Sequence, residues 1–323
     1  MQESQVPHTA ILIVGKSWIP ARVIDAWLRT GNRIAEVWCF DPDSALLGPP
    51  TGLFGRFFPA WDVSRLLARH RVPIRLCPPL KSWEKAHDRI AETGADVLMT
   101  LMAGEIVPAP LLARFGGRAV NFHPAMLPHY KGPSPRLGML LDGKADEAGG
   151  VTLHVLSPGI DEGPIIARRA VPRSQARNQL HWDALQAVAA ADLVAGALLD
   201  YLDGRLEAVP QAPGSGNYRR VPPAELAIGP AIDAERALWL CETLGEADAL
   251  HCAGPGGKTI PVVGFGRHLG SPTGAARRLG PVHVEIDVRD ARLRLRRRNP
   301  LWKAAAWARK VDAVRRAGET GGD

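Results

Sequence analysis

Short apolar runs alternate with helix-patterned segments over the first hundred residues, and this alternation strongly constrains the fold. The apolar runs occupy residues 10–14, 34–40, 72–77 and 96–102. The segments between them that space apolar side chains as a helix does are residues 17–28, 63–69 and 82–93. Strands that alternate with helices predict a parallel sheet covered by helices on both faces. We therefore expect an α/β fold with a doubly wound, mostly parallel sheet.

The rest of the chain predicts a division into two parts. Further strands are expected at residues 118–122, 151–156 and 165–171, followed by a long helix at 179–202. Residues 209–223 (VPQAPGSGNYRRVPP) are rich in Pro, Gly and Ser, as linkers are. Short strands at 259–263 and 282–288 and an amphipathic helix at 302–316 follow. We predict a catalytic domain over 1–208, a linker over 209–223 and a smaller α+β domain over 224–323.

The cysteines and the apolar segments suggest a soluble cytoplasmic protein with no membrane partner. The four cysteines form no C-x-x-C pair, so neither a disulfide framework nor a structural zinc site is indicated. Residues 1–10 lack the basic start and apolar run of a signal peptide. The most apolar later stretch, residues 184–202, carries Asp192 and Asp200, whose charges would oppose membrane insertion. We expect it to be a packed helix.

Three polar residues could form a reactive group. Asn121 and His123 stand two residues apart at the end of a predicted strand, so their side chains point to the same face. Asp161 lies in a Gly-rich turn, from where its carboxylate could reach His123. An amide donor, a base that titrates near neutral pH and a carboxylate together suit acyl transfer. Each residue alone is more often structural, so the residues themselves leave acyl transfer as one option among several.

The motifs around these residues resemble those of the folate-dependent formyltransferases, in particular the methionyl-tRNA formyltransferase type. The family's N-x-H-x-S-L-L-P motif is similar to residues 121–128 (NFHPAMLP), and its basic-Gly step resembles Lys131 and Gly132. The family's G-V-T and D-x-G-x-I blocks resemble residues 150–152 and 161–165. The resemblance covers about residues 10–205 and implies a Rossmann-like formyltransferase domain.

The resemblance implies an enzyme of one-carbon metabolism that transfers a formyl group from 10-formyltetrahydrofolate, a co-substrate, to an amine. His123 would assist proton movement, Asn121 would donate to the oxyanion, and Asp161 would hold His123 in its productive state. The resemblance implies no metal. The folate would bind against two mainly apolar segments that contain Met102, Ala103, Gly104, Ile106, Val107, Leu156, Ser157, Gly159 and Ile160.

Departures from the family pattern leave the amine acceptor open. Ala125 replaces the usual Ser of the first motif. Residues 15–20 (GKSWIP) and 40–57 differ from the corresponding loops of methionyl-tRNA formyltransferases. The acceptor could be an aminoacyl-tRNA, an amino sugar nucleotide or another small amino metabolite. A formyltetrahydrofolate hydrolase and a non-catalytic folate- or RNA-binding module remain as alternatives.

The positive charge is concentrated at the C-terminal end. The chain has a formal charge of +7, and residues 267–323 hold 14 Lys and Arg against 6 Asp and Glu. Residues 292–298 (RLRLRRR) alternate Arg with Leu. Such a cluster could attract the phosphates of a tRNA, or it could be the solvated side of a half-buried strand. The sequence leaves both interpretations, and the oligomeric state, open.

Overall fold

The first two hundred residues of the chain build a seven-stranded sheet in the order β3-β2-β1-β4-β5-β6-β7. The computed structural model describes residues 6–254, 258–275 and 278–319. The pairs from β3 to β5 are parallel, whereas β5 with β6 and β6 with β7 are antiparallel. The strands are β1 Thr9–Val14, β2 Arg33–Cys39, β3 Ile74–Leu76, β4 Val97–Leu101, β5 Ala119–His123, β6 Gly150–Val155 and β7 Ile165–Ala170.

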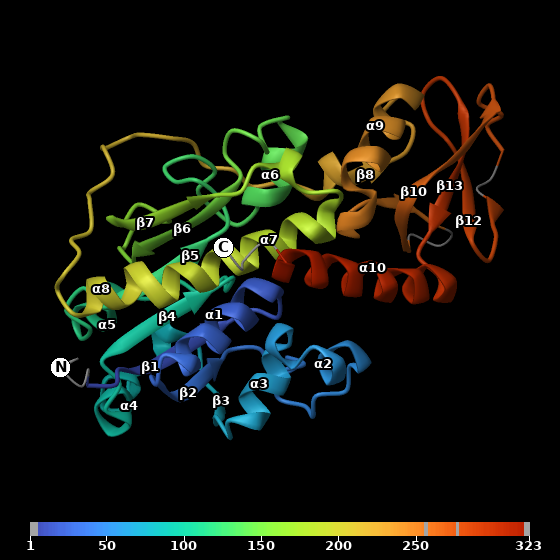
Figure 1. The fold of residues 1–323 in the computed structure, drawn as a ribbon. Helices are drawn as coiled ribbons and strands as arrows, with labels where there is room; N and C mark the ends of the chain where they lie inside the picture. The colour runs from blue at the N-terminus through green and yellow to red at the C-terminus, as the bar shows by residue number, and fades with distance from the viewer. Residues whose placement is uncertain (1–5, 255–257, 276–277, 320–323) are drawn as a thin grey trace.

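Helices cover both faces of this sheet, as the alternating pattern predicts (Figure 1). In β1, Ala10, Leu12 and Val14 face one core, while Ile11 and Ile13 face the other. The helices packed on the first core are α1 Trp18–Arg29, α3 Val63–Arg69, α6 Pro135–Leu141 and α7 Gln179–Leu193. Those on the second core are α4 Ala86–Thr93 and α5 Ala109–Ala113. The doubly wound α/β fold is thereby confirmed.

The predicted helix boundaries differ from the structure at one place in this half. The expected helix over 82–93 begins only at Ala86, because Leu80–Ser82 forms a separate 3-10 turn after two prolines. A short helix that the sequence pattern did not suggest, α2, covers Leu53–Phe57 in the long loop after β2.

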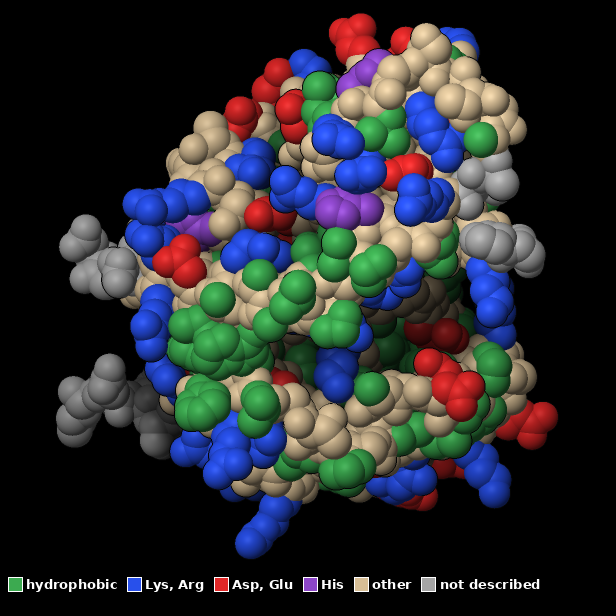
Figure 2. Space-filling view, turned by 90° about the vertical axis from the view of Figure 1, so that its right-hand side faces the viewer, with side chains coloured by type: hydrophobic (Ala, Val, Ile, Leu, Met, Phe, Trp, Pro, Cys, Tyr) green, Lys and Arg blue, Asp and Glu red, His purple; other side chains and the backbone are tan. Residues whose placement is uncertain are grey.

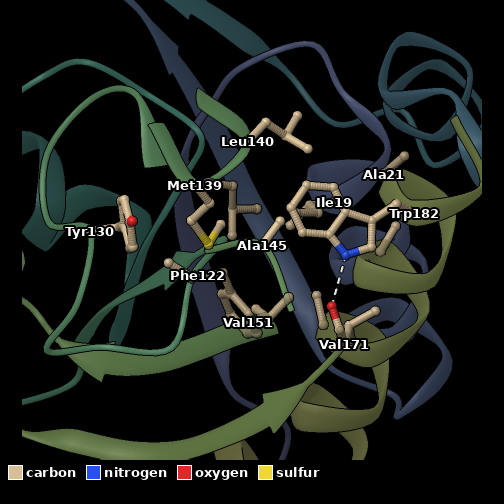
Figure 3. Close-up of a cluster of buried hydrophobic side chains, with 14 of the residues drawn as sticks. Ile19, Ala21, Phe122, Tyr130, Met139, Leu140, Ala145, Val151, Val171 and Trp182 are labelled. Carbon is tan, nitrogen blue, oxygen red and sulfur yellow. Dashed lines mark hydrogen bonds between the residues drawn. The ribbon is translucent and has the colours of Figure 1, made fainter. Parts of the chain in front are cut away.

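Trp182 anchors the long helix to the sheet. Its side chain is fully buried, and its indole Nε1 donates to the Val171 carbonyl at 2.7 Å. Figure 3 shows this indole among apolar side chains that include Ile19 of α1 and Met139 of α6. Phe122 of β5 belongs to the same cluster, so the strand that carries Asn121 and His123 is backed by packed core.

The expected helix over 179–202 is one continuous helical segment. It runs through α7, a π-helical turn at Val194–Leu198 and α8, Leu199–Leu202. By length and composition this segment could cross a membrane, and half of its most apolar window is buried inside the structure. The buried residues of α7, among them Trp182 and Ala187, pack against the first core, so the expected packed helix is confirmed.

A second sheet follows in the order β11-β12-β13-β10-β9-β8. All but the last residue of the run at 292–298 forms β13, in which Leu293 and Leu295 are buried. The interpretation of this run as a half-buried strand is therefore confirmed. The elements are β8 Ala227–Ile228, α9 Ala234–Leu244, β9 His251–Ala253, β10 Thr259–Gly270, β11 Arg278–Leu279, β12 His283–Asp287, β13 Arg292–Arg297 and α10 Pro300–Glu319.

The last helix returns to the first half of the molecule. Figure 1 shows α10 running beside α7. Ala313 and Ala317 of α10 and Ala184 of α7 form one small buried cluster. Small side chains let two helices approach closely. The expected domain limits at 208 and 224 stay a prediction, and α10 packs across them.

Candidate active site

A cavity of about 390 Å³ opens where β4 and β5 end. Open α/β sheets place ligands at the carboxyl ends of their strands. Asn121, His123 and Asp161 all line this cavity. The structure also brings into it every residue that the resemblance assigned to folate, namely Met102, Ala103, Gly104, Ile106, Val107, Leu156, Ser157, Gly159 and Ile160. The roles of these residues stay predictions, but their convergence is a property of the structure.

The side-chain amide of Asn121 is held in one orientation. Thr100, on the neighbouring strand β4, donates its hydroxyl proton to Asn121 Oδ1 at 2.9 Å. The Asn121 Nδ2 amino group therefore points the other way, 3.0 Å from His154 Nε2 and 3.5 Å from Asp161 Oδ1. An amide fixed in this way presents a donor to the cavity.

His123 is buried between two acceptors. Its Nε2 lies 2.8 Å from the Tyr130 carbonyl oxygen, and its Nδ1 lies 3.4 Å from Asp161 Oδ2. Because a carbonyl oxygen only accepts, Nε2 carries the proton in the neutral ring and Nδ1 is left free to accept one. Burial lowers the pKa of His123, although the Asp161 charge raises it in part. His123 is therefore suited to act as a neutral base whose imidazolium would be stabilised by Asp161.

Asp161 is an ionised carboxylate inside the site. Its Oδ2 accepts from the backbone N–H of Gly132 at 2.8 Å, and its Oδ1 lies 3.5 Å from His154 Nε2. Burial alone would raise the pKa of Asp161, but its contacts with His154, His123 and Gly132 lower it to about 2. The carboxylate therefore stays charged throughout the physiological pH range.

Backbone strain is concentrated around the cavity. Within the described ranges five residues other than glycine adopt a positive φ, and three of them, Met102, Tyr130 and Asp161, border this site. Each such residue costs of order 1 kcal/mol or more, and strain of this kind clusters at functional sites. The surrounding contacts must therefore hold these three residues in place.

Several residues of the site were not predicted from the sequence. Thr100 and His154 are buried polar residues within otherwise apolar strands, and that exception to the pattern was the available signal. Tyr218 lines the cavity although it lies in the predicted linker. Nothing in the linker's composition indicates this position, because it results from the path of the chain in space.

A hydroxyl from β6 secures the loop in which Ala125 replaces the family's Ser. Thr152 is fully buried, donates to the Ala125 carbonyl at 2.7 Å and accepts from the Leu127 N–H at 3.0 Å. These two bonds satisfy the carbonyl of the substituted residue and the N–H two residues further along the chain. The loop after His123 is therefore tied to the sheet without a serine at 125.

Among the described residues, no group of three or more His, Cys, Asp or Glu side chains could hold a metal ion. The polar groups of the cavity can instead donate a hydrogen bond to a developing oxyanion and accept one proton. Those are the requirements of acyl transfer.

Known proteins resemble this chain in both sequence and fold. Residues 65–180 match the profile of the family described as formyl transferase. Methionyl-tRNA formyltransferase from Listeria monocytogenes serotype 4a is 32% identical over 150 residues, which are 46% of this chain and 47% of that protein. The enzyme of that name from Ruegeria pomeroyi is 31% identical over 193 residues, 58% of this chain and 59% of that protein. The chain thus matches about half the length of these curated relatives.

Two solved structures share the fold. A sugar N-formyltransferase from Shewanella sp FDAARGOS_354 has a TM-score of 0.59 and 17% identity, covering 79% of this chain and 96% of that chain. An N-formyltransferase from Helicobacter canadensis, in complex with folinic acid and dTDP-3-aminofucose, has a TM-score of 0.54 and 13% identity, covering 90% and 99%. At these identities the likeness extends to the fold alone.

Proposed function

We propose that this chain, whose residues 65–180 match the formyl transferase family, transfers a formyl group from 10-formyltetrahydrofolate to a primary amine. One observation carries this proposal. A fixed amide donor, a buried neutral base and an ionised carboxylate, at Asn121, His123 and Asp161, converge in one cavity. This set can stabilise the charge that develops on a formyl oxygen and remove a proton from the attacking amine.

Each residue has a defined role in the proposed reaction. As the amine nitrogen bonds to the formyl carbon, the Asn121 amide donates to the formyl oxygen. His123 Nδ1 accepts the proton that the amine loses, and Asp161 stabilises the resulting imidazolium from 3.4 Å. His123 then returns the proton to the folate nitrogen as its bond to the formyl carbon breaks.

Exposed apolar side chains in the cavity support a folate as the donor. Ile106 and Ile160 line the cavity, and their side chains are 50% and 46% exposed. Large apolar side chains at that exposure gain from burial against a planar heterocycle. The complex of the Helicobacter canadensis structure with folinic acid supports a folate of this kind as the donor.

We propose two candidate acceptors for the formyl group. An aminoacyl-tRNA is the first to test, and an amino sugar nucleotide is the second. The sequence relatives are methionyl-tRNA formyltransferases, while the Shewanella structure is a sugar N-formyltransferase. A tRNA would contact the C-terminal basic residues. Several of them are already engaged in ion pairs; Arg292, for example, pairs with Asp287, and Arg294 pairs with Glu285. Figure 2 shows Lys and Arg interspersed with Asp, Glu and His on that end of the molecule.

An acceptor panel tests this proposal. The chain is incubated with 10-formyltetrahydrofolate and, separately, charged initiator tRNA, amino sugar nucleotides and simple amines, and products are identified by mass spectrometry. A formylated amine that depends on His123 is the expected result. Formate released without any amine would identify a hydrolase instead, and no reaction with any acceptor would refute the proposal.

We expect the enzyme to act in the cytoplasm, where its four buried cysteines would remain reduced thiols.

A further inference from the structure

The segment that follows α8 runs along the edge of the site before it reaches the second sheet. We call residues 209–219 the strap. Val209 pairs with Ile165 as an isolated bridge, and Tyr218 pairs with Lys131. The Lys131 N–H donates to the Asn217 carbonyl at 2.9 Å, and the Lys131 carbonyl accepts from the Arg219 N–H at 2.7 Å. The strap is thus joined by backbone hydrogen bonds to the loop that follows the His123 strand.

The strap also fits this loop closely. Gly216 has a φ of +76°, and a Cβ there would lie 1.8 Å from the Pro128 carbonyl oxygen. Gly132 has a φ of +101°, and a Cβ there would lie 2.6 Å from the Tyr218 ring. Side chains at either position would push the two segments apart, so the sequence provides glycine on both sides of the contact.

Gln211 fixes the loop that carries Asp161. Its Nε2 donates to the backbone carbonyls of Asp161 and Gly163, each at 2.8 Å. Two carbonyls only accept, so an amide nitrogen with two protons satisfies both and an oxygen could satisfy neither. Asp161 is held at a φ of +54°, in the left-handed region that residues with a side chain seldom adopt. The Gln211 contact therefore supports the backbone at a strained position.

Asn217 fixes the second loop with the opposite polarity. Its Oδ1 accepts from the backbone N–H of Tyr130 at 2.9 Å. The carbonyl of Tyr130 in turn accepts from His123 Nε2 at 2.8 Å, which sets the proton of that ring. His123 lies between the Asp161 carboxylate and the Tyr130 carbonyl. Gln211 and Asn217 thus bind the backbone of the two residues that carry these groups.

We propose that Gln211 and Asn217 are positioning residues of the active site, which align Asp161 and Tyr130 on His123. The role of this alignment in catalysis rests on the proposed formyl transfer. The strap connects the two sheets and also fixes both loops. It is therefore part of the active site and does more than link the two sheets.

The two residues allow a matched pair of substitutions. Gln211→Glu and Asn217→Asp each replace an amide by a carboxylate of nearly the same shape and each add one negative charge. Gln211→Glu removes the donor on which the Asp161 loop depends, whereas Asn217→Asp keeps the acceptor that Tyr130 needs. The proposal therefore requires opposite outcomes from the same chemical change. Asn217→Leu, which removes the acceptor, completes the set.

The first readout needs no substrate. The pKa of His123 is measured by NMR titration and assigned with His123→Gln. Among the described residues the titratable groups that act on this ring are Asp161, which raises the pKa of His123, and His154, which lowers it. Displacing Asp161 should place the pKa of His123 in Gln211→Glu about one unit below that in Asn217→Asp. Equal values in the two variants would overturn the proposal.

The second readout is formyl transfer. Gln211→Glu and Asn217→Leu should lower kcat by about tenfold to a hundredfold with little change in KM for the folate, because they misplace groups at the reacting end. Asn217→Asp should recover most of the Asn217→Leu loss. Ser215→Ala, which removes from the strap a hydroxyl that has no hydrogen-bond partner in the structure, is the control. Thermal unfolding checks the fold, and Gln211→Met replaces Gln211→Glu if the latter does not fold.

These readouts separate the two claims. An NMR difference without any formyl transfer would refute the proposed function and leave the positioning role intact. Formyl transfer in which Gln211→Glu and Asn217→Asp behave alike would refute the positioning role alone.

Discussion

At the scale of single residues, the reactivity of the site depends on how neighbouring groups orient Asn121 and His123. The Thr100 hydroxyl decides which end of the Asn121 amide faces the cavity, and the Tyr130 carbonyl decides which nitrogen of His123 carries the proton. The trio itself could be predicted from motif spacing. These partners could not, because they meet through space across separate strands and loops.

Thr100→Val tests the orientation of the amide. The substitution keeps the shape of the side chain but removes the donor to Asn121 Oδ1, so the amide is free to turn. We expect kcat to fall about tenfold while KM for the folate changes little. Thr93→Val, at the end of α4 and away from the cavity, is the matched control and should keep the parental kcat. Equal rates in the two variants would show that the Thr100 contact is dispensable.

The pH dependence of the rate reports on His123. As a base it must be neutral, and burial lowers its pKa, so activity should persist below the usual histidine value of about 6.5. Asp161→Asn removes the charge that raises this pKa. The acid limb of the kcat/KM profile should then move to lower pH, with a rate loss of about a hundredfold. A limb that moves to higher pH would contradict the assignment of the base.

At the scale of elements, the central strands β1 and β4 of the first sheet were predictable because each is a short apolar run buried on both faces. The 3-10 turn before α4 and the path of the strap were not. Hydrogen bonds with residues distant in sequence, such as Asn217 with Tyr130, set that path, and no local pattern encodes it.

One buried charge pair secures the edge of that sheet. Glu36 of β2 is 1% exposed, and it accepts from Arg89 Nε at 2.9 Å and from Trp38 Nε1 at 2.6 Å. Burial raises the pKa of Glu36, but the bonds from Arg89, Trp38 and Arg75 bring it below its usual value. The carboxylate is therefore ionised and depends on its partners.

Arg89→Met should lower the free energy of unfolding by about 3 kcal/mol at pH 7, because it leaves a buried charge with fewer partners. The loss should shrink toward pH 4 as Glu36 takes up a proton. Arg29→Met removes an exposed partner of Asp25 and should change stability by only about 0.5 kcal/mol. Urea unfolding at both pH values measures this, and equal losses at pH 7 and pH 4 would exclude the charge as the cause.

At the scale of the whole molecule, the chain closes on itself through α10. The helix lies at the end of the sequence but packs on α7 through Ala313 and Ala317, which are almost fully buried. The sequence predicted an amphipathic helix here, but not its partner, because alanine carries little signal of where it will pack.

Ala313→Leu should lower the free energy of unfolding by about 2 kcal/mol, because the added atoms overfill the contact with α7. Ala305→Leu, on the exposed side of the same helix, is the control and should have little effect. Denaturant unfolding followed by tryptophan fluorescence measures both. An equal effect of the two substitutions would argue against the packing of α10 on the first half.

The most direct test of the central claim is a single-turnover measurement of 10-formyltetrahydrofolate with the acceptor found in the panel. We expect one formylated amine for each tetrahydrofolate formed by the parental chain. His123→Gln should be slower by about a hundredfold or more. If His123→Gln transfers the formyl group at the parental rate, the group formed by Asn121, His123 and Asp161 is not the catalytic centre.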